Sequence, residues 1–409
     1  MNLHGDKILM GFEQHPASIC THKGTLYIDR SNKKIKRTMS DFNAEFVETE
    51  VFKTGAAIGF WPKVTRSCDK FFDVEYVEHP IMWSDMTNKQ ILGAYLRLCD
   101  ILEYLNEYGY TIGSHLWNVV LSNSVYKLID VGDFCKFDRN VQATTLKLCL
   151  QKHEHDDESY KLGSWTKTPQ KIIEAIDKHQ SIDEVRQALK ESGFVGNTPD
   201  PTWDRYAPAY NSFTNLSLSH DNPKDNPLRR WINSIKPETL TDLGCNTGKH
   251  TLSTAKELRI KCVGIDYAAN TIDEAVENAR SMGLACGFAK VDLLNPATVG
   301  LYDPPAKRLW SEMVIAPALV HHLFRACKDI KLAVDTIAAY GSKYAAIEFI
   351  PCTDVHINCN IQDWFRLDDI KRKLWNRGFT SIKVEPSFPK GRKWIFAEKN
   401  ASNQNHFRF

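Results

Sequence analysis

The second half of the chain alternates regularly between short apolar runs and segments whose apolar residues have helical spacing. The apolar runs lie at residues 239–243, 261–265, 288–291 and 313–316, and the segments with helical spacing lie at 251–258 and 272–281. Strand-helix repetition of this length predicts a parallel, doubly wound sheet of the Rossmann-like type, which binds ligands at the carboxyl ends of its strands. The fold class expected for this half is therefore α/β.

The first 150 residues have a different pattern, in which strands dominate and one long helix interrupts them. Strand-like runs at 25–28 and 71–77 precede a helix expected over 89–108, whose leucines share one face. Two short apolar runs, 119–121 and 126–129, then form a predicted hairpin that ends at Asp130. This half is expected to be an α+β domain.

Two polar stretches divide the chain. The first is the acidic run 153–158 and the second is 196–201, which is rich in Gly, Asn and Pro. Residues 168–192 between them have helical spacing. We therefore expect an N-terminal domain at 1–150, a helical connector at 151–200, a C-terminal domain at 201–400 and a polar tail at 401–409.

The composition excludes several classes of protein but does not indicate an activity. The 409 residues are 43% hydrophobic and 25% charged with a formal net charge of +2, so disorder and global attraction to nucleic acid or membrane are not expected. No apolar run approaches the roughly 18 residues that span a bilayer, and Met1 to Gln14 lacks a signal-peptide core. Eleven cysteines occur singly without zinc-ligand spacing, which indicates reduced thiols and a cytoplasmic protein.

The segment with the clearest chemistry is Asp242 to Gly248 (DLGCNTG), between a predicted strand and a predicted helix. Glycines at 244 and 248 permit a tight turn and a close approach of the backbone to a ligand. Asp266 ends the next strand, where a carboxylate can accept both hydrogen bonds of a ribose diol, and Asp292 ends the third. The ordered set of a loop and two acids predicts a nucleoside-type site.

This set resembles the class I S-adenosylmethionine-dependent methyltransferases, over about residues 200 to 400. The resemblance implies S-adenosyl-L-methionine as cofactor, with ribose on Asp266 and the adenine amine on Asp292. A nicotinamide-binding Rossmann domain is the competing interpretation, but the GxGxxG spacing is absent. The implied cofactor-binding residues are Asp242, Gly244, Asn246, Thr247, Gly248, Asp266, Tyr267, Asp292 and Leu293.

Acceptor chemistry is expected further along the chain. His321 and His322 follow the fourth strand and Glu348 lies in the fifth; these segments resemble nodulation-type and glycan-modifying methyltransferases. A histidine titrates near working pH and would act as general base, unless the pair only starts a helix. Glu348 is the third candidate catalytic residue, because an acid in a buried strand is unusual without a partner. Candidate substrate-binding residues are Arg205, Tyr206, Asp354 and Arg392.

The N-terminal half resembles eukaryotic-like kinases. Asn118 and Asp130 match the Asn and Asp that a hairpin brings onto Mg²⁺ beside the phosphates of ATP. Lys36 would be the phosphate-binding lysine, and Glu45 or Glu48 its ion-pair partner. The resemblance implies a nucleotide site, but Gly113 stands where the catalytic base should be and no glycine-rich phosphate loop precedes it. We therefore expect a degenerate kinase-like module, with kinase activity absent.

The two halves together resemble bifunctional kinase–methyltransferases that cap O-antigen chains. The first hypothesis is methylation of an oxygen on a glycan, sugar phosphate or small metabolite. A nucleic-acid methyltransferase is not favoured, because the charge is near zero and no N/D-P-P-Y/F motif follows the fourth strand. A non-catalytic ligand-sensing scaffold is the third hypothesis. The sequence does not indicate the oligomeric state.

Overall fold

The computed structural model describes residues 13–14, 25–29, 32–68, 71–113, 118–150, 174, 176, 178, 181–191, 226–297, 303–354, 357, 360 and 363–399. The chain divides into two compact units, called unit 1 (residues 1–198 with 298–302) and unit 2 (199–297 with 303–409). The polar stretches expected at 153–158 and 196–201, the tail 401–409, Arg205 and Tyr206 lie outside the described residues.

Unit 1 begins with an antiparallel sheet in the order β1-β2-β3-β5-β4. Its strands are β1 (Glu13–Gln14), β2 (Leu26–Asp29), β3 (Lys34–Arg37), β4 (Val64–Arg66) and β5 (Phe72–Val74). Two helices, α2 (Asp41–Phe46) and α3 (Glu50–Ala57), connect β3 to β4. The side chains of Ser40 and Thr49 cap these helices by accepting backbone N–H groups of their first turns.

The remainder of unit 1 is organised by α4 (Asn88–Glu107), the helix predicted over 89–108. Its start is fixed by a capping box between Thr87 and Gln90, and its apolar face is fully buried. The predicted hairpin is confirmed as β7–β8. The elements of this part are the 3₁₀ turn η2 (Trp83–Asp85), β6 (Tyr110–Ile112), which pairs with β9 (Phe134–Lys136), β7 (Val119–Ser122), β8 (Val125–Leu128), α5 (Arg139–Leu150) and α7 (Ile182–Glu191).

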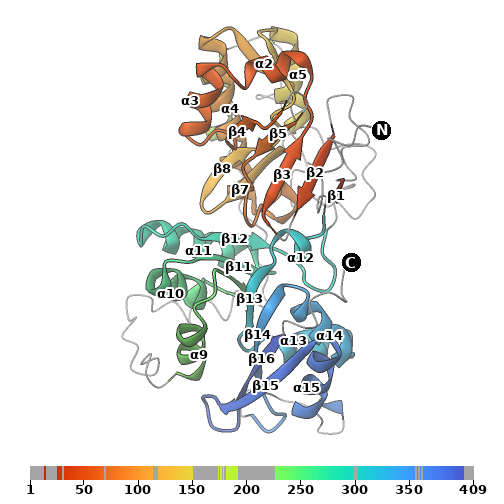
Figure 1. The fold of residues 1–409 in the computed structure, drawn as a ribbon. Coiled ribbons are helices and arrows are strands. Elements are labelled where there is room, and N and C mark those ends of the chain that lie inside the picture. Colours follow the sequence, from red (N-terminus) through yellow and green to blue (C-terminus); the bar gives the residue numbers. More distant parts are fainter. Residues whose placement is uncertain are drawn as a thin grey trace. The chain divides into compact units, whose positions relative to one another are not determined.

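Unit 2 is built on a seven-stranded sheet in the order β12-β11-β10-β13-β14-β16-β15, and it is Rossmann-like (Figure 1). Its strands are β10 (Thr239–Leu243), β11 (Lys261–Asp266), β12 (Gly287–Lys290), β13 (Ser311–Ala316), β14 (Gly341–Phe349), β15 (Phe379–Pro386) and β16 (Lys393–Lys399). Strands β10 to β14 are parallel, as predicted, and β16 is antiparallel to both β14 and β15. The order reverses between β10 and β13, which is where doubly wound sheets bind ligands.

Helices cover both faces of this sheet, with α9 to α11 on one side and α13 to α15 on the other (Figure 1). They are α9 (Pro227–Ile235), α10 (Lys249–Leu258), α11 (Ala269–Ser281), α12 (Pro305–Arg308), α13 (Val320–Cys327), α14 (Ile330–Ala338) and α15 (Leu367–Asn376). One apolar core joins α9, α10 and α11 to the sheet and includes Leu252, Ile272, Phe288 and Phe396. This packing makes the carboxyl-end loops project from a rigid base.

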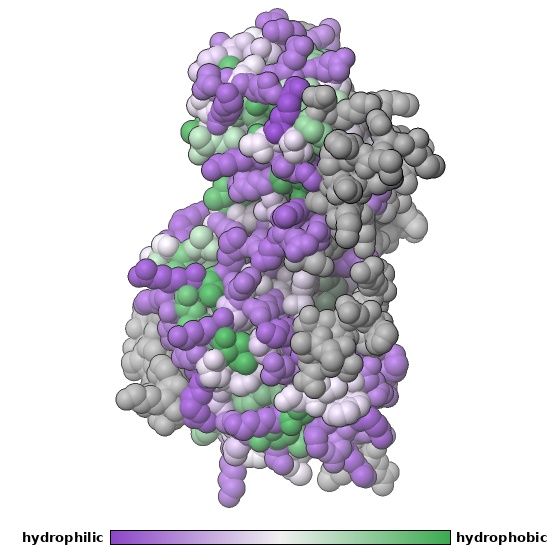
Figure 2. Space-filling view, in the orientation of Figure 1, coloured by the Kyte–Doolittle hydropathy of each residue, from purple (hydrophilic) through white to green (hydrophobic). Residues whose placement is uncertain are grey.

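One face of the molecule can be judged for its surface chemistry. The face drawn in Figure 2 is mainly hydrophilic, with small separate hydrophobic areas. None of the described helices is both long enough and apolar enough to span a membrane. Most cysteines in the described ranges are free thiols, but Cys352 is disulfide-bonded, so the expectation of uniformly reduced cysteines is wrong at this residue.

Candidate functional site

Three residues of the loop between β10 and α10 have a left-handed backbone conformation, which glycine and asparagine adopt more readily than other residues. Gly244, Asn246 and Gly248 have φ angles of 69°, 51° and 88°. A Cβ on Gly248 would lie 2.9 Å from Cε1 of Phe288, so a larger residue would be both strained and crowded. The backbone N–H groups of Gly244 and Cys245 donate to the Ile265 carbonyl, which ties the loop to the end of β11.

Asp242 is fully buried at the end of β10. Its Oδ2 accepts from the backbone N–H of Thr251 at 3.1 Å and from the Thr251 hydroxyl at 2.7 Å. Burial raises the pKa of this carboxyl to about 7, although Thr251 acts in the opposite direction. Its Oδ1 is buried and has no hydrogen-bond partner among the described residues, so one acceptor oxygen of this carboxyl is unsatisfied there.

Asp266 at the end of β11 faces the same loop. Its Oδ2 accepts from the Asn246 N–H at 2.9 Å and its Oδ1 from the Ala268 N–H at 3.0 Å. Burial raises its pKa, and these amides oppose the rise. Each oxygen has a second lone pair, so the carboxylate can still accept from a diol. Tyr267 beside it is 54% exposed and offers an aromatic ring at the rim.

The remaining predicted cofactor-binding residues differ in their burial and in their hydrogen bonds. Thr247 is buried, and its carbonyl accepts from the Asn278 side chain at 3.2 Å. Asp292 follows β12 and is exposed; its Oδ1 accepts from the N–H groups of Leu294 and Asn295. Leu293 is half-buried next to it. The loop, Asp266 and Asp292 therefore lie at the ends of three adjacent parallel strands.

His321 and His322 begin α13, with ring centroids 3.9 Å apart. Burial, with smaller contributions from the neighbouring His322 and the cationic Arg392 and Arg325, lowers the pKa of His321 to about 3. Burial and Arg325 lower the pKa of His322 to about 4. Both imidazoles are neutral at pH 7, so the expected titration near working pH is not found. Nδ1 of His321 is buried without a partner among the described residues.

Glu348, near the end of β14, connects two loops at the carboxyl ends of the strands. Its Oε2 accepts from the Ala318 N–H at 3.0 Å, and its Oε1 accepts from the Ser387 hydroxyl at 2.6 Å. Ala318 has a φ of 46°, an uncommon conformation for a residue with a Cβ, and the Glu348 contact helps to hold it. Burial raises the pKa of Glu348, against the opposing effects of Ser387 and Arg392.

Asp354 and Arg392, both predicted to bind substrate, bind each other. Nε of Arg392 donates to Oδ2 of Asp354 at 2.7 Å, and Nη2 donates to Oδ1 at 3.2 Å. This bidentate pair is largely buried. The positive charge of Arg392 is therefore compensated within the protein.

In unit 1, Asp130 forms an ion pair with the side chain of Arg37. The Arg37 guanidinium donates to Oδ1 of Asp130 at 2.6 Å, and the Gly132 N–H donates to the same oxygen at 3.1 Å. Arg37 is 8% exposed, and a Cβ on Gly132 would lie 2.1 Å from its Nη2. Asn118 is buried just before β7, and its carbonyl accepts from the Ile129 N–H.

Lys36 and Glu45 do not form the expected pair. Lys36 binds Asp73 with a 2.5 Å ion pair on the opposite face of β3 from Arg37. Glu45 is exposed, and within the described ranges it makes no ion pair. Because side chains alternate along a strand, the basic residue that faces Asp130 is the next one, Arg37.

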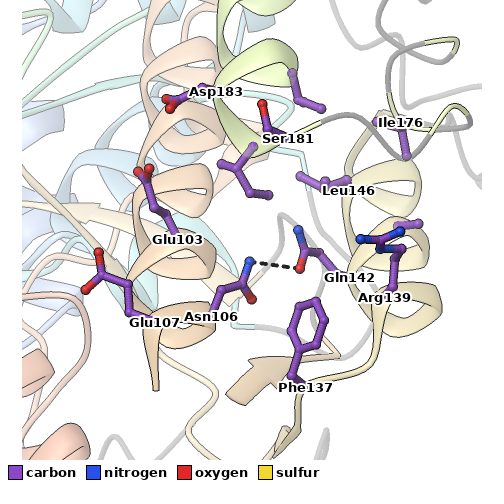
Figure 3. A pocket seen from close by; sticks show the side chains of 13 residues that line it. Glu103, Asn106, Glu107, Phe137, Arg139, Gln142, Leu146, Ile176, Ser181 and Asp183 are labelled. Carbon is purple, nitrogen blue, oxygen red and sulfur yellow. Dashed lines mark hydrogen bonds between the residues drawn. The ribbon is translucent and has the colours of Figure 1, made fainter. Parts of the chain in front are cut away.

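Unit 1 contains a cavity of about 680 Å³ between α4, α5 and the start of α7 (Figure 3). Asn106 and Gln142 bridge it with a 3.0 Å hydrogen bond, and Glu103 at its rim binds Arg186. No predicted site residue lines this cavity. No group of three or more His, Cys, Asp or Glu residues suited to a metal ion occurs in the described part of the chain.

Several residues at these sites were not predicted. Thr251 and Ser387 bind Asp242 and Glu348, and Arg37 binds Asp130. Arg37 stands next to the predicted Lys36, but the local sequence does not indicate which of the two basic residues faces Asp130. No sequence signal links Ser387 to Glu348, 39 positions apart, because the contact depends on the pairing of β14 with β16.

Unit 2 is Rossmann-like, and its 244–248 turn lies at the switch point of the sheet. No family model matches the chain. The chain is 28% identical over 162 residues to nodulation protein NoeA of Rhizobium meliloti, covering 37% of this chain and 32% of NoeA. It is also 28% identical over 144 residues to the 23S rRNA (uracil(747)-C(5))-methyltransferase RlmC of Shewanella halifaxensis, covering 31% of this chain and 37% of RlmC.

Among solved structures, the chain is similar to magnesium protoporphyrin IX methyltransferase of Synechocystis with bound SAH. The identity is 15%, the TM-score is 0.35, and the match covers 53% of this chain and 98% of that one. This chain spans about a third of the length of the curated relatives that it matches.

Proposed function

We propose that unit 2 is an S-adenosylmethionine-dependent methyltransferase that methylates an oxygen on a glycan, sugar phosphate or small metabolite. The observation that carries the proposal is the site formed by Asp242, the 244–248 turn and Asp266 at adjacent strand ends. The methyltransferase among the curated relatives supports it.

The residues present fit this cofactor. The unpartnered Oδ1 of Asp242 suits the ammonium group of a methionine moiety, and Asp266 suits a ribose diol. Gly248 keeps the turn in its left-handed conformation against Phe288, where no Cβ fits, and Tyr267 and Leu293 offer apolar surface for adenine. When bound, the cofactor supplies a methyl group on a sulfonium, whose C–S electron pair stays on sulfur as the acceptor oxygen forms the new C–O bond.

The acceptor side carries the proton chemistry. A neutral imidazole of His321 or His322 can accept the hydroxyl proton that must leave as the C–O bond forms. An imidazole whose pKa lies near 3 or 4 is a weak base, so most of the rate must come from alignment of oxygen and methyl. Glu348 orients the loop before α13, because it accepts from the Ala318 N–H in that loop and is itself held by the Ser387 hydroxyl.

Isothermal titration of the full chain with S-adenosylhomocysteine tests this proposal. We expect micromolar binding by the natural chain and a loss of at least 30-fold in Asp266→Ala. Asp368→Asn is the matched control, because its carboxyl is exposed on α15 and binds only Lys371. Equal affinities for all three proteins, or no binding by the natural chain, would contradict the proposal.

RNA is a second candidate acceptor, because RlmC acts on 23S rRNA. Methyl transfer from labelled S-adenosylmethionine to total RNA, compared with transfer to a carbohydrate and phenol panel, separates the two. Labelled RNA would support this second candidate, and labelled small molecules alone would exclude it.

For unit 1 we propose a kinase-like module without kinase activity. The support is the placement of Asn118 before β7 and Asp130 after β8, on one hairpin, beside an antiparallel sheet. The Arg37–Asp130 pair argues against a bound Mg²⁺, since the guanidinium occupies the carboxylate that a metal would need. Titration with ATP, with and without Mg²⁺, tests whether Asp130 can hold the metal: metal-dependent binding that Asp130→Ala abolishes would contradict the argument from the Arg37–Asp130 pair, and phosphorylation of any acceptor would contradict the absence of kinase activity.

A further inference from the structure

The loop between β15 and β16, residues 387–392, lies at the ligand edge of unit 2. Lys393 opens β16 and pairs with Phe349, which ends β14, so the loop stands at the carboxyl end of the parallel strands. The 244–248 turn and Asp266 lie at the same edge. With about 4.8 Å between neighbouring strands, the loop is roughly 10 Å from the end of β13, which leads to the histidines.

The base of this loop is held firmly on both sides. Ser387 donates its hydroxyl to Glu348, and Arg392 binds Asp354 through two hydrogen bonds. The Ser387 N–H also donates to the Arg392 carbonyl at 2.9 Å, which closes the loop across its base. Glu348 and Asp354 are only 6% and 8% exposed, so the anchors are buried and the position of the loop tip is defined.

The loop tip presents an aromatic ring to solvent. Phe388 is 74% exposed, the largest value for a large hydrophobic residue in the part of the chain that the structure describes. A second aromatic group follows β14, where the Trp364 ring lies 5.9 Å from Phe324 and 6.4 Å from His321. Asp354 neutralises Arg392, so we do not expect this guanidinium to bind a ligand through its charge.

We propose that Phe388 is an acceptor-binding and specificity residue, which packs against the flat face of a ring that carries the hydroxyl to be methylated. This inference rests on the proposed methyltransferase function of unit 2. A sugar ring and a phenol share the required chemistry, a flat apolar face next to a hydroxyl group. An exposed phenylalanine gains free energy when such a face covers it, and the rigid loop loses little entropy.

The test compares Phe388→Ala, Phe388→Tyr and Trp375→Ala in the full chain. Trp375 is 58% exposed near the end of α15, and Phe379, which follows it, pairs with Lys399 at the opposite edge of the sheet. Acceptors are methyl glycosides of hexoses and N-acetylhexosamines, and a set of phenols and catechols. Release of S-adenosylhomocysteine gives kcat and KM, and calorimetry gives the Kd of S-adenosylhomocysteine.

We expect Phe388→Ala to raise the KM of the accepted ring compound at least 10-fold, with kcat and the S-adenosylhomocysteine Kd changed less than threefold. Phe388→Tyr and Trp375→Ala should match the natural chain, and the preferred panel member identifies a sugar or a phenol. An unchanged KM in Phe388→Ala, or cofactor binding without turnover of any ring compound, would overturn the inference. Failure to bind S-adenosylhomocysteine at all would instead remove the proposed function and this inference with it.

Discussion

Units 1 and 2 each place an aspartate at the end of a strand beside a glycine, but the protein treats the two carboxylates differently. Asp130 of unit 1 is bound by the Arg37 guanidinium and the Gly132 N–H. Asp242 of unit 2 accepts only from Thr251, and its Oδ1 has no partner in the described part of the chain. One carboxylate is thus compensated by a cation within the fold, and the other keeps one oxygen without a hydrogen-bond partner among the described residues.

The difference shows what a motif can and cannot predict. An Asn and an Asp on a hairpin place two potential metal ligands together, but a basic residue from another strand decides whether a metal can use them. A carboxylate that accepts from backbone and hydroxyl donors keeps capacity for a ligand. Four predictions test this comparison.

The largest effect is expected at the turn of unit 2. Gly248→Ala should abolish S-adenosylhomocysteine binding and lower the free energy of unfolding of unit 2 by about 3 kcal/mol, because the new Cβ is crowded by Phe288 at positive φ. Gly283→Ala is the matched control: its φ is 64°, but nothing lies within 4 Å of the new Cβ. It should cost only about 1 kcal/mol. Calorimetry of both variants measures the difference, and equal costs would show that the crowding does not matter.

The second effect is the pH dependence of unit 2. The folded pKa of Asp242 is about 7, above its unfolded value, so between about pH 4 and pH 7 the folded state binds more protons. Stability without ligand should therefore fall as pH rises through this window, by an amount on the order of 2–4 kcal/mol. Asp266 and Glu348 have pKa values raised in the same direction and add to the fall.

Asp242→Asn isolates the Asp242 contribution. The variant should lose that part of the pH dependence in denaturant titrations from pH 4 to pH 8. S-adenosylhomocysteine affinity should rise through pH 7 in the natural chain, because the ionised carboxylate accepts the ligand ammonium, and the rise should vanish in the variant. An affinity that is flat with pH in both proteins would mean that Oδ1 is not the ammonium acceptor.

Much of unit 2 could be predicted from sequence because its parallel strands are continuous apolar runs, and both acids stand where those runs end. The β15–β16 pair escaped prediction, since polar residues alternate along β15 and the pairing is set by long-range register. Long-range strand pairing also explains why Lys36 was predicted in place of Arg37. Two adjacent basic residues have the same local pattern, and only the pairing of β3 with β2 and β5 decides which one faces Asp130.

The third effect separates these two residues in unit 1. Arg37→Gln should lower the free energy of unfolding of unit 1 by about 2 kcal/mol, because Asp130 loses a largely buried partner. It should also create weak Mg²⁺ binding, visible as stabilisation by millimolar Mg²⁺. Lys36→Gln, on the same strand, removes an exposed ion pair with Asp73 and a 3.4 Å hydrogen bond to Ser67, and it should cost less than about 0.5 kcal/mol. Equal losses in the two variants would remove the distinction between the faces of β3.

The smallest effect is expected at Glu348, whose hydrogen bonds connect two loops of unit 2. Glu348→Gln keeps the shape of the side chain, but its amide nitrogen cannot accept a hydrogen bond, so either Ala318 or Ser387 loses its acceptor. We expect a loss of about 1 kcal/mol in the free energy of unfolding and faster hydrogen exchange at the Ala318 amide. S-adenosylhomocysteine affinity should stay within twofold, because the 244–248 turn does not depend on this contact. A large loss of cofactor affinity in Glu348→Gln would instead show that the loops after β10 and β13 form one cooperative unit. Glu348 would then contribute to cofactor binding as well as to the acceptor side of the site.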